Sequence, residues 1–303
     1  MKYVIALDAG TTSVRAFVYD LAKGAFVYGA QQEVGQSFPR PGWVEQDADE
    51  IYYKAAYVLN DCLRFGEGEV AGIGLTNQRE TTVLWDRATG EPVCPAIGWQ
   101  CRRTSEWWAP PARATHARVG ARGAAHVTDV TNASRTMLFN IRTLDWDEAL
   151  LTRFSIPREI LPEVRSCDAR MGEMRTRDGV LPICGVAGDQ QSALVGQNCL
   201  RPGEGKITYG TGLFLLFNTG ERCTLSHSGL LTTVGYRLGG RTAYALEGSS
   251  FHAGSGVQWL RDGLGLIENA AQSGQLAASV SDTGGVCFVP AFTGLGAPHW
   301  DPD

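Results

Sequence analysis

The sequence predicts an α/β fold made of two related domains. Two stretches about two hundred residues apart each have an apolar strand, a glycine-threonine turn and a second strand, centred on Gly10-Thr11-Thr12 and Gly210-Thr211-Gly212. Between them, short apolar runs alternate with segments of helical periodicity. A strand–turn–strand unit that occurs once in each half indicates an internally duplicated fold with a cleft between the halves.

Bulk properties exclude several classes of protein. The 303 residues are 44% hydrophobic and 19% charged, which is typical of a globular chain that can bury a core. The net charge of −5 predicts no nucleic-acid partner. No stretch reaches the ~20 apolar residues of a membrane span, and Val4–Leu7 is too short for a signal peptide. The eight cysteines contain no C-x-x-C pair, so we expect reduced thiols in the cytoplasm and no zinc site.

The first elements follow from apolar patterning. Val4–Leu7 reads as a buried strand, and the alternation in Val14–Tyr19 predicts its hairpin partner. A helix is expected from residue 49 to 64, capped by Asp47 or Asp49. Its buried face would consist of Ile51, Ala55, Val58, Leu59 and Cys62.

Two strands are expected after this helix. Val70–Leu75 predicts one strand, and Thr82–Trp85 predicts another that leads into a hairpin turn. Residues 107–123 then show no clear period, and twelve of these seventeen residues are Ala, Arg, Pro or Gly. This composition fits either a basic surface loop or a damaged or misread segment.

Residues 158–165 predict a short helix, and Leu181–Ala187 predicts a strand that leads into another helix. The second glycine-threonine turn joins two strands, Lys206–Tyr209 and Leu213–Phe217. Beyond it, we expect a helix over His252–Leu260 and a strand over Val286–Pro290.

The two turns carry residues that suit a phosphate group. Glycine lets the backbone approach a ligand closely, and successive N–H groups together with threonine hydroxyls can bind an anion. Neither turn matches the Walker A or G-x-G-x-x-G pattern, so an ordinary hairpin turn stays an alternative. Asp8, at the end of the first strand, can form a turn or hold Mg²⁺ through water.

Three further positions have both a structural and a functional interpretation. Arg79 and Glu80 can pair at a surface turn, or offer donors and an acceptor to a polyol. Asp189 can cap a helix, or act as a general base where a strand ends. Trp99 can belong to the core, or pack its face against a carbon chain.

Several motifs resemble the FGGY family of carbohydrate kinases and, within it, the glycerol kinases. They include "LDAGTTSVRA", "LTNQRETT", "VTDVTNASRTMLFN", "GVAGDQQSALVGQ" and "AGSGVQWL". The resemblance implies ribonuclease H-like domains of the actin-like ATPase fold, with an N-terminal domain over 1–195 and a C-terminal domain over 196–303. Compared with the family, the chain is expected to have an internal gap at 107–123 and an incomplete second domain.

The resemblance also implies a role for each matching residue. Phosphate and nucleotide contacts would come from Thr11, Thr12, Ser13, Arg15, Thr211, Gly254 and Gln258, with Asp8 near Mg²⁺. The substrate-binding residues would be Arg79, Glu80, Asp189 and Gln190, with Trp99 and Phe214 as an apolar wall. Asp189 would be the catalytic base.

The implied activity is the ATP-dependent phosphorylation of glycerol to sn-glycerol 3-phosphate, with ATP and ADP as nucleotide partners. Arg79-Glu80 and "NASRTMLFN" favour glycerol over another sugar or polyol of the family. A non-catalytic remnant of such a kinase is the alternative from a different class. The sequence leaves open whether the chain forms a homo-oligomer.

Overall fold

The computed structural model describes residues 2–65, 68–86, 88–103, 126–176, 179–210, 212–292 and 294–301. Segment 107–123 and Thr211 lie outside the described residues. The chain divides into two compact units. Unit 1 comprises Met1–Ser192 and Val234–Ala243, and unit 2 comprises Ala193–Thr233 and Tyr244–Asp303. The domain boundary expected between residues 195 and 196 stays a prediction.

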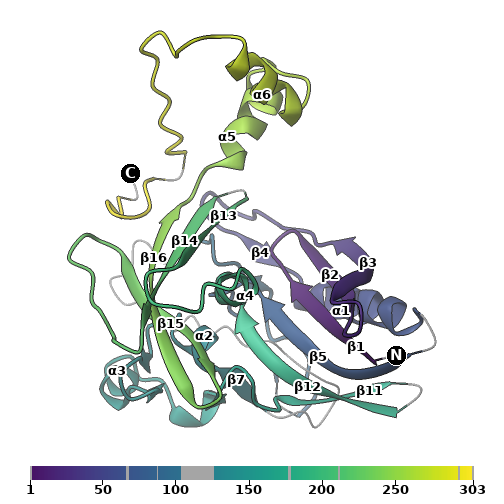
Figure 1. Ribbon diagram of the computed structural model, residues 1–303. Coiled ribbons are helices and arrows are strands. Elements are labelled where there is room, and N and C mark those ends of the chain that lie inside the picture. The colour runs from purple at the N-terminus through teal and green to yellow at the C-terminus, as the bar shows by residue number, and fades with distance from the viewer. Residues whose placement is uncertain are drawn as a thin grey trace. The chain divides into compact units, whose positions relative to one another are not determined.

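Unit 1 is built on a six-stranded sheet in the order β11-β12-β5-β1-β2-β3 (Figure 1). The strands are β1 (Lys2–Ala9), β2 (Ser13–Asp20), β3 (Ala25–Glu33), β5 (Glu69–Asn77), β11 (Gly172–Thr176) and β12 (Gly179–Gly188). Strands β1, β5 and β12 are parallel to one another, so their carboxyl ends share one edge of the sheet. At this edge Asn77 is the register partner of both Ala9 and Gly188.

Helix α1 (Ala48–Leu63) covers part of this sheet, where its five predicted apolar residues pack into the core (Figure 1). Val58, Leu59 and Cys62 are its buried residues. Asp47 caps the helix by accepting hydrogen bonds from two backbone N–H groups of the first turn. The predicted helix, its face and one of its two candidate caps are confirmed.

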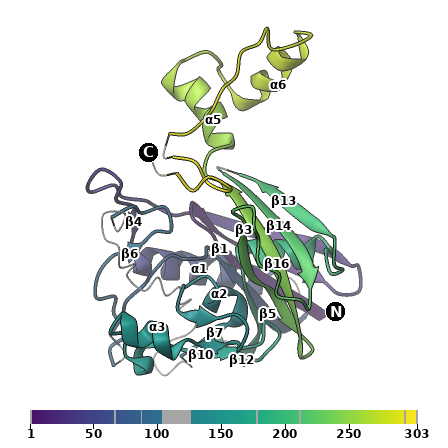
Figure 2. The ribbon, with the colours of Figure 1, turned by 90° about the vertical axis from the view of Figure 1, so that its left-hand side faces the viewer.

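Short elements complete unit 1, and Figure 2 shows α2 beside β7 and β10. The short strands form the pairs β4 (Glu45–Gln46) with β6 (Ala96–Ile97), β7 (Val127–Asp129) with β10 (Glu163–Arg165), and β8 (Phe139–Asn140) with β9 (Asp145–Trp146). The helices are α2 (Val130–Ala133), α3 (Glu148–Arg153), the 3₁₀ helix η1 (Arg158–Ile160) and α4 (Asp189–Gly196), which runs on into unit 2.

Unit 2 has a four-stranded sheet in the order β13-β14-β16-β15. Its strands are β13 (Gly205–Tyr209), β14 (Leu213–Gly220), β15 (Leu231–Leu238) and β16 (Arg241–Ser250), and residues 234–243 of the last hairpin group with unit 1. The helices that follow are α5 (Gly254–Gln258), the π-helix η2 (Trp259–Gly263) and α6 (Ala270–Ala278). Both predicted strand–turn–strand units are therefore antiparallel hairpins, β1–β2 and β13–β14.

Three of the predicted elements are wrong or only partly right. Thr82–Trp85 makes single bridges, Thr82 with Ile97 and Trp85 with Pro92, because its neighbours lie in different segments. Residues 158–165 form a 3₁₀ turn followed by β10, which pairs with β7. Val286–Pro290 forms no strand within the described part of the chain, because no neighbouring strand pairs with it, and Val286 is 72% exposed.

Two absences concern only the residues that the structure describes. Within that part of the chain, no helix is both long enough and apolar enough to cross a membrane. All eight cysteines lie in the described ranges, and no disulfide joins any of them there.

Candidate active site

The carboxyl edge of the sheet in unit 1 brings Asp8 and Asp189 near each other. Asp8 lies at the end of β1, and Asp189 starts α4 directly after β12. Burial and the Asp189 carboxylate raise the pKa of Asp8 to about 6, and Arg15, its register partner on β2, offsets only part of this effect. A divalent cation would relieve the repulsion between two such carboxylates, so these residues fit Mg²⁺, which binds through one or two carboxylates and keeps several waters.

The first glycine-threonine turn sits beside Asp8. A Cβ atom at Gly10 would lie 3.0 Å from the Ser13 carbonyl oxygen, which explains the need for a small residue there. Thr12 is exposed and Thr11 is half-buried, whereas Ser13 is buried and accepts a hydrogen bond from Arg15 Nε at 3.1 Å. The turn therefore presents its threonines to a ligand more readily than its serine.

Arg79 forms an ion pair with Asp189 across the edge of the sheet. Arg79 Nε lies 3.1 Å from Asp189 Oδ1, and Arg79 Nη1 donates to Gln191 Oε1 at 3.3 Å. Gln190 donates to the same carboxylate, from its backbone N at 2.7 Å and its side chain at 3.1 Å. The Asp189 side chain is nevertheless 37% exposed, so it remains accessible to a substrate while its orientation is held from two sides.

Glu80 has a different partner. Arg135 Nε and Nη2 lie 2.8 Å and 2.6 Å from Glu80 Oε1. The backbone of Glu80 is left-handed, with φ at 67°, a conformation that non-glycine residues adopt at an energetic cost and that is enriched at functional sites. Arg79 therefore pairs with Asp189, and Glu80 pairs with Arg135. The sequence interpretation missed Arg135, although this residue lies within the motif "VTDVTNASRTMLFN".

Trp99, a predicted residue of the apolar substrate wall, contacts the first glycine-threonine turn. Its indole N–H donates to Thr11 Oγ1 at 3.0 Å, and its backbone N–H donates to Thr81 Oγ1 at 3.3 Å. The circuit closes through two buried glutamines: Thr81 donates to Gln78, Gln78 to Gln46, and Gln46 to the Thr11 carbonyl. Such a closed circuit couples the positions of Thr11 and Trp99. Sequence reasoning found neither glutamine.

Trp99→Phe tests this connection. Phenylalanine keeps an apolar ring but removes the indole donor to Thr11. For the ATP-dependent phosphorylation of glycerol that the resemblance implies, we expect KM for ATP to rise several-fold, since one hydrogen bond is worth about 1 kcal/mol, and KM for glycerol to change less. Steady-state kinetics with each substrate varied in turn measures both. An unchanged KM for ATP would show that the Trp99–Thr11 contact does not position the turn.

Gly188 is required for the position of Arg79. A Cβ atom at Gly188 would lie 2.6 Å from both Cγ and Cδ of Arg79 and 3.0 Å from Gln191 Oε1. Gly188→Ala should therefore displace Arg79, raise KM for glycerol and lower the free energy of unfolding by about 1–3 kcal/mol. Gly196→Ala is the matched control, because nothing lies within 4 Å of a Cβ atom there. Kinetics and urea denaturation of the two variants provide the comparison.

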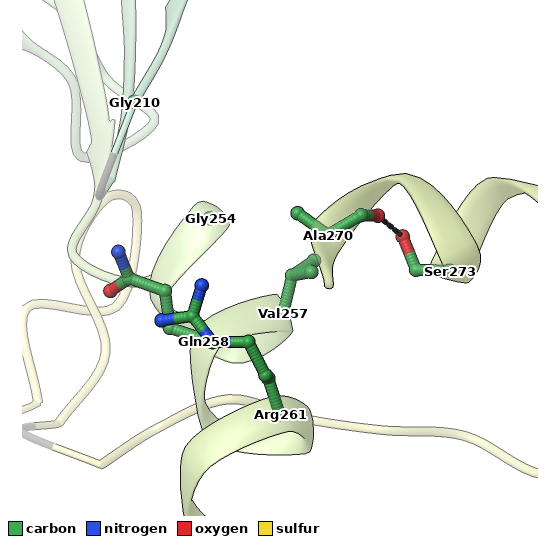
Figure 3. Close-up of a pocket in the computed structure, with 7 residues that line it drawn as sticks. All are labelled: Gly210, Gly254, Val257, Gln258, Arg261, Ala270 and Ser273. Atoms are coloured by element: carbon green, nitrogen blue, oxygen red, sulfur yellow. Dashed lines mark hydrogen bonds between the residues drawn. The ribbon is translucent and has the colours of Figure 1, made fainter. Parts of the chain in front are cut away.

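Unit 2 contains a separate pocket of about 350 Å³ (Figure 3). It is lined by Gly210, Gly254, Val257, Gln258, Arg261, Ala270 and Ser273. The pocket brings together Gly254 and Gln258, two predicted nucleotide contacts, and the Gly254 N–H donates to the Gly210 carbonyl at 3.0 Å. Phe214, the other predicted wall residue, lies half-buried on β14 of the same unit, so its grouping with Trp99 stays a prediction.

The sequence matches two family models that together span most of the chain. Residues 3–116 and 119–196 match the N-terminal domain of the FGGY family of carbohydrate kinases, and residues 205–303 match its C-terminal domain. The chain therefore belongs to the FGGY family of carbohydrate kinases. The predicted fold class, that of the actin-like ATPases, is confirmed by this membership and by the structural neighbours below.

Within this family, curated relatives of the chain are glycerol kinases. It is 47% identical to glycerol kinase 1 of Pseudomonas aeruginosa, over 99% of this chain and 72% of that protein. It is 48% identical to the glycerol kinase of Alkalilimnicola ehrlichii, over 100% of this chain and 72% of that protein. The first alignment extends over 354 positions against a chain of 303 residues, so that relative has residues inside the matched range that this chain lacks.

Among solved structures, a glycerol kinase supports the same assignment and a xylulose kinase shows the same fold. The glycerol kinase of Plasmodium falciparum with ADP superposes with a TM-score of 0.85 and 34% identity, over 100% of this chain and 71% of that chain. A ligand-bound xylulose kinase of Lactobacillus acidophilus superposes with a TM-score of 0.82 at 19% identity, over 100% of this chain and 71% of that chain. This kinase shares the fold of the chain. The resemblance of the sequence to glycerol kinases is confirmed.

Proposed function

We propose that the chain transfers the γ-phosphoryl group of ATP to glycerol and forms sn-glycerol 3-phosphate. The observation that carries this proposal is the Arg79–Asp189 pair, held at the carboxyl edge of the sheet beside Asp8. Ligands of open α/β sheets gather at this edge. The glycerol kinases among the relatives of the chain support glycerol as the acceptor.

In this mechanism, Asp189 is the general base. It accepts the proton of a primary hydroxyl while that oxygen forms a bond to the γ-phosphorus, and the bond to the β–γ bridging oxygen breaks to release ADP. Arg79 and Glu80 bind the remaining hydroxyls, and Arg79 and Gln190 hold the Asp189 carboxylate in place. A positioned base contributes typically 10²–10⁴-fold, and most of the remaining catalysis of phosphoryl transfer comes from alignment and charge neutralisation.

Each unit, taken by itself, offers residues that we propose as nucleotide contacts. In unit 1, Thr11, Thr12 and Arg15 offer donors near Asp8, and the neighbouring Ser13 is buried. In unit 2, Thr211 and the pocket lined by Gly254 and Gln258 are the proposed contacts. Asp8, with Asp189 nearby, would hold Mg²⁺, which would neutralise phosphate charge when bound.

Three further proposals accompany this function. We propose domains over 1–195 and 196–303, which the extents of the two family matches support. We propose a cytoplasmic location, in keeping with eight cysteines that form no disulfide in the described ranges. We propose that glycerol and ATP/ADP are the ligands, and a homo-oligomer remains an open alternative to a monomer.

The test is ADP release by the purified chain, shown to be folded by circular dichroism, with MgATP and glycerol. Parallel reactions replace glycerol by xylulose or gluconate. Turnover that depends on glycerol supports the proposal. Turnover with a sugar but not with glycerol would assign another member of the family, and a folded chain with no turnover would be a non-catalytic remnant.

A further inference from the structure

The segment from Asp129 to Arg135 forms a buried polar network that the mechanism above does not use. The Asp129 side chain is fully buried and accepts hydrogen bonds from the backbone N–H groups of Thr131 and Asn132, from both of their side chains, and from the Cys167 thiol at 3.3 Å. Burial and the nearby Asp129 raise the pKa of Cys167 well above its usual value, so the thiol stays a donor. Asp129 thus fixes the two polar side chains of the short helix α2, those of Thr131 and Asn132.

These two side chains reach the ends of two sheet strands. Thr131 Oγ1 accepts a hydrogen bond from the Gly188 N–H at 2.9 Å. Asn132 exchanges two hydrogen bonds with the side chain of Asn77, each 3.0 Å long. Gly188 directly precedes Asp189, and Asn77 lies two residues before Arg79, so each contact holds the backbone that carries a proposed substrate residue.

The same segment also reaches the third substrate residue. Arg135 contacts Glu80 at 2.6 Å and 2.8 Å, and only a tenth of its side chain is exposed. Asn77, Asn132 and Thr131 are each at most 5% exposed, so water does not compete for these hydrogen bonds. Three residues of the segment 129–135 therefore contact the backbone before Asp189, the strand end before Arg79 and the side chain of Glu80.

We propose that residues 129–135 act as the positioning element of the polyol site, with Thr131, Asn132 and Arg135 as positioning residues that act through Gly188, Asn77 and Glu80. The assignment of the polyol rests on the proposed function. Phosphoryl transfer depends on alignment, and a misplacement of about 1 Å can cost roughly 10²-fold in rate. A network that ties three reacting or binding groups to one rigid segment supplies this alignment.

The test compares Thr131→Val with Thr131→Ser. Valine has nearly the shape of threonine but leaves the buried Gly188 N–H without an acceptor, whereas serine keeps the hydroxyl. In Thr131→Val we expect kcat with glycerol to fall by up to roughly 10²-fold, the cost of a misplacement of about 1 Å at Asp189, with KM for ATP nearly unchanged. Thr131→Ser should retain most of the wild-type kcat.

Amide hydrogen exchange gives a second readout that needs no turnover. Thr131→Val should speed exchange at residues 186–191, and Thr131→Ser should match the wild type. If the wild type turns over no glycerol, the proposed function fails, while this exchange comparison still decides the positioning role. The positioning role is overturned if the two variants behave alike, either because both match the wild type or because both lose activity and thermal stability together.

Discussion

Asp189→Asn is expected to lower kcat for glycerol phosphorylation by about 10²–10⁴-fold while the chain stays folded. Asparagine has the volume of aspartate, and its carbonyl oxygen can still accept from Arg79 Nε and the Gln190 N–H. An amide cannot take the proton of the attacking hydroxyl, so the loss should appear in kcat. The substitution leaves the buried Arg79 guanidinium without a charged partner and also frees Asp8 from the Asp189 charge, so its two effects on stability oppose each other.

Steady-state release of ADP, followed together with thermal denaturation, measures both effects. Asp145→Asn is the matched control, because its side chain is 67% exposed and its contact with Arg158 is 3.4 Å long. This control should keep full activity. If Asp189→Asn retained more than about a tenth of the wild-type kcat, another group would have to serve as the base.

Several elements of unit 1 were predictable because their signals are local. The apolar run of Val4–Leu7, the alternation of Val14–Tyr19 and the carboxylate of Asp47 before a helical period each act within a few residues. Val286–Pro290 carries the same kind of apolar signal, yet no strand pairs with it in the described part of the chain. A strand depends on its partner, and a single run cannot encode that partner.

The same limit applies to the candidate site. The residue types at Arg79 and Asp189 suggested binding and catalysis, because acids and arginines beside strand ends are chemically informative. Their partners were not predictable: Arg135 reaches Glu80 across 55 positions, and Gln191 reaches Arg79 across 112. Such pairs arise only when parallel strands bring distant segments to one edge. Gln46 and Gln78 carry no catalytic signal of their own, and only the hydrogen-bond circuit gives them a role.

Asp8→Asn is expected to stabilise the ligand-free chain in a pH-dependent manner. The pKa of Asp8 in the folded state, about 6, lies above its ordinary value of 3.8. The folded state therefore binds more protons than the unfolded state between these values, and wild-type stability falls as the pH rises through this range. Below pH 3.8 the carboxyl is protonated in both states and does not lower the free energy of unfolding. Above pH 6 the carboxylate lowers the free energy of unfolding by its full amount, about 3 kcal/mol.

An asparagine at position 8 has no charge to desolvate and does not repel Asp189. Relative to the wild type, we therefore expect a gain of about 3 kcal/mol at pH 7.5 and about half of that at pH 5. Urea denaturation in the presence of EDTA, at several pH values between 5 and 8, measures the difference. A difference that does not change with pH would mean that Asp8 is not the group whose ionisation opposes folding.

The same variant should lose turnover with MgATP, because an amide at position 8 is a weaker ligand for Mg²⁺ than a carboxylate. A gain in stability combined with a loss of activity would show that burying a carboxylate beside Asp189 opposes folding and is retained for catalysis. Asp145→Asn, at an exposed position, should show neither change. If Asp8→Asn were stabilised and fully active, the charge at position 8 would have no part in phosphoryl transfer, and the Mg²⁺ site would have to be sought among other residues.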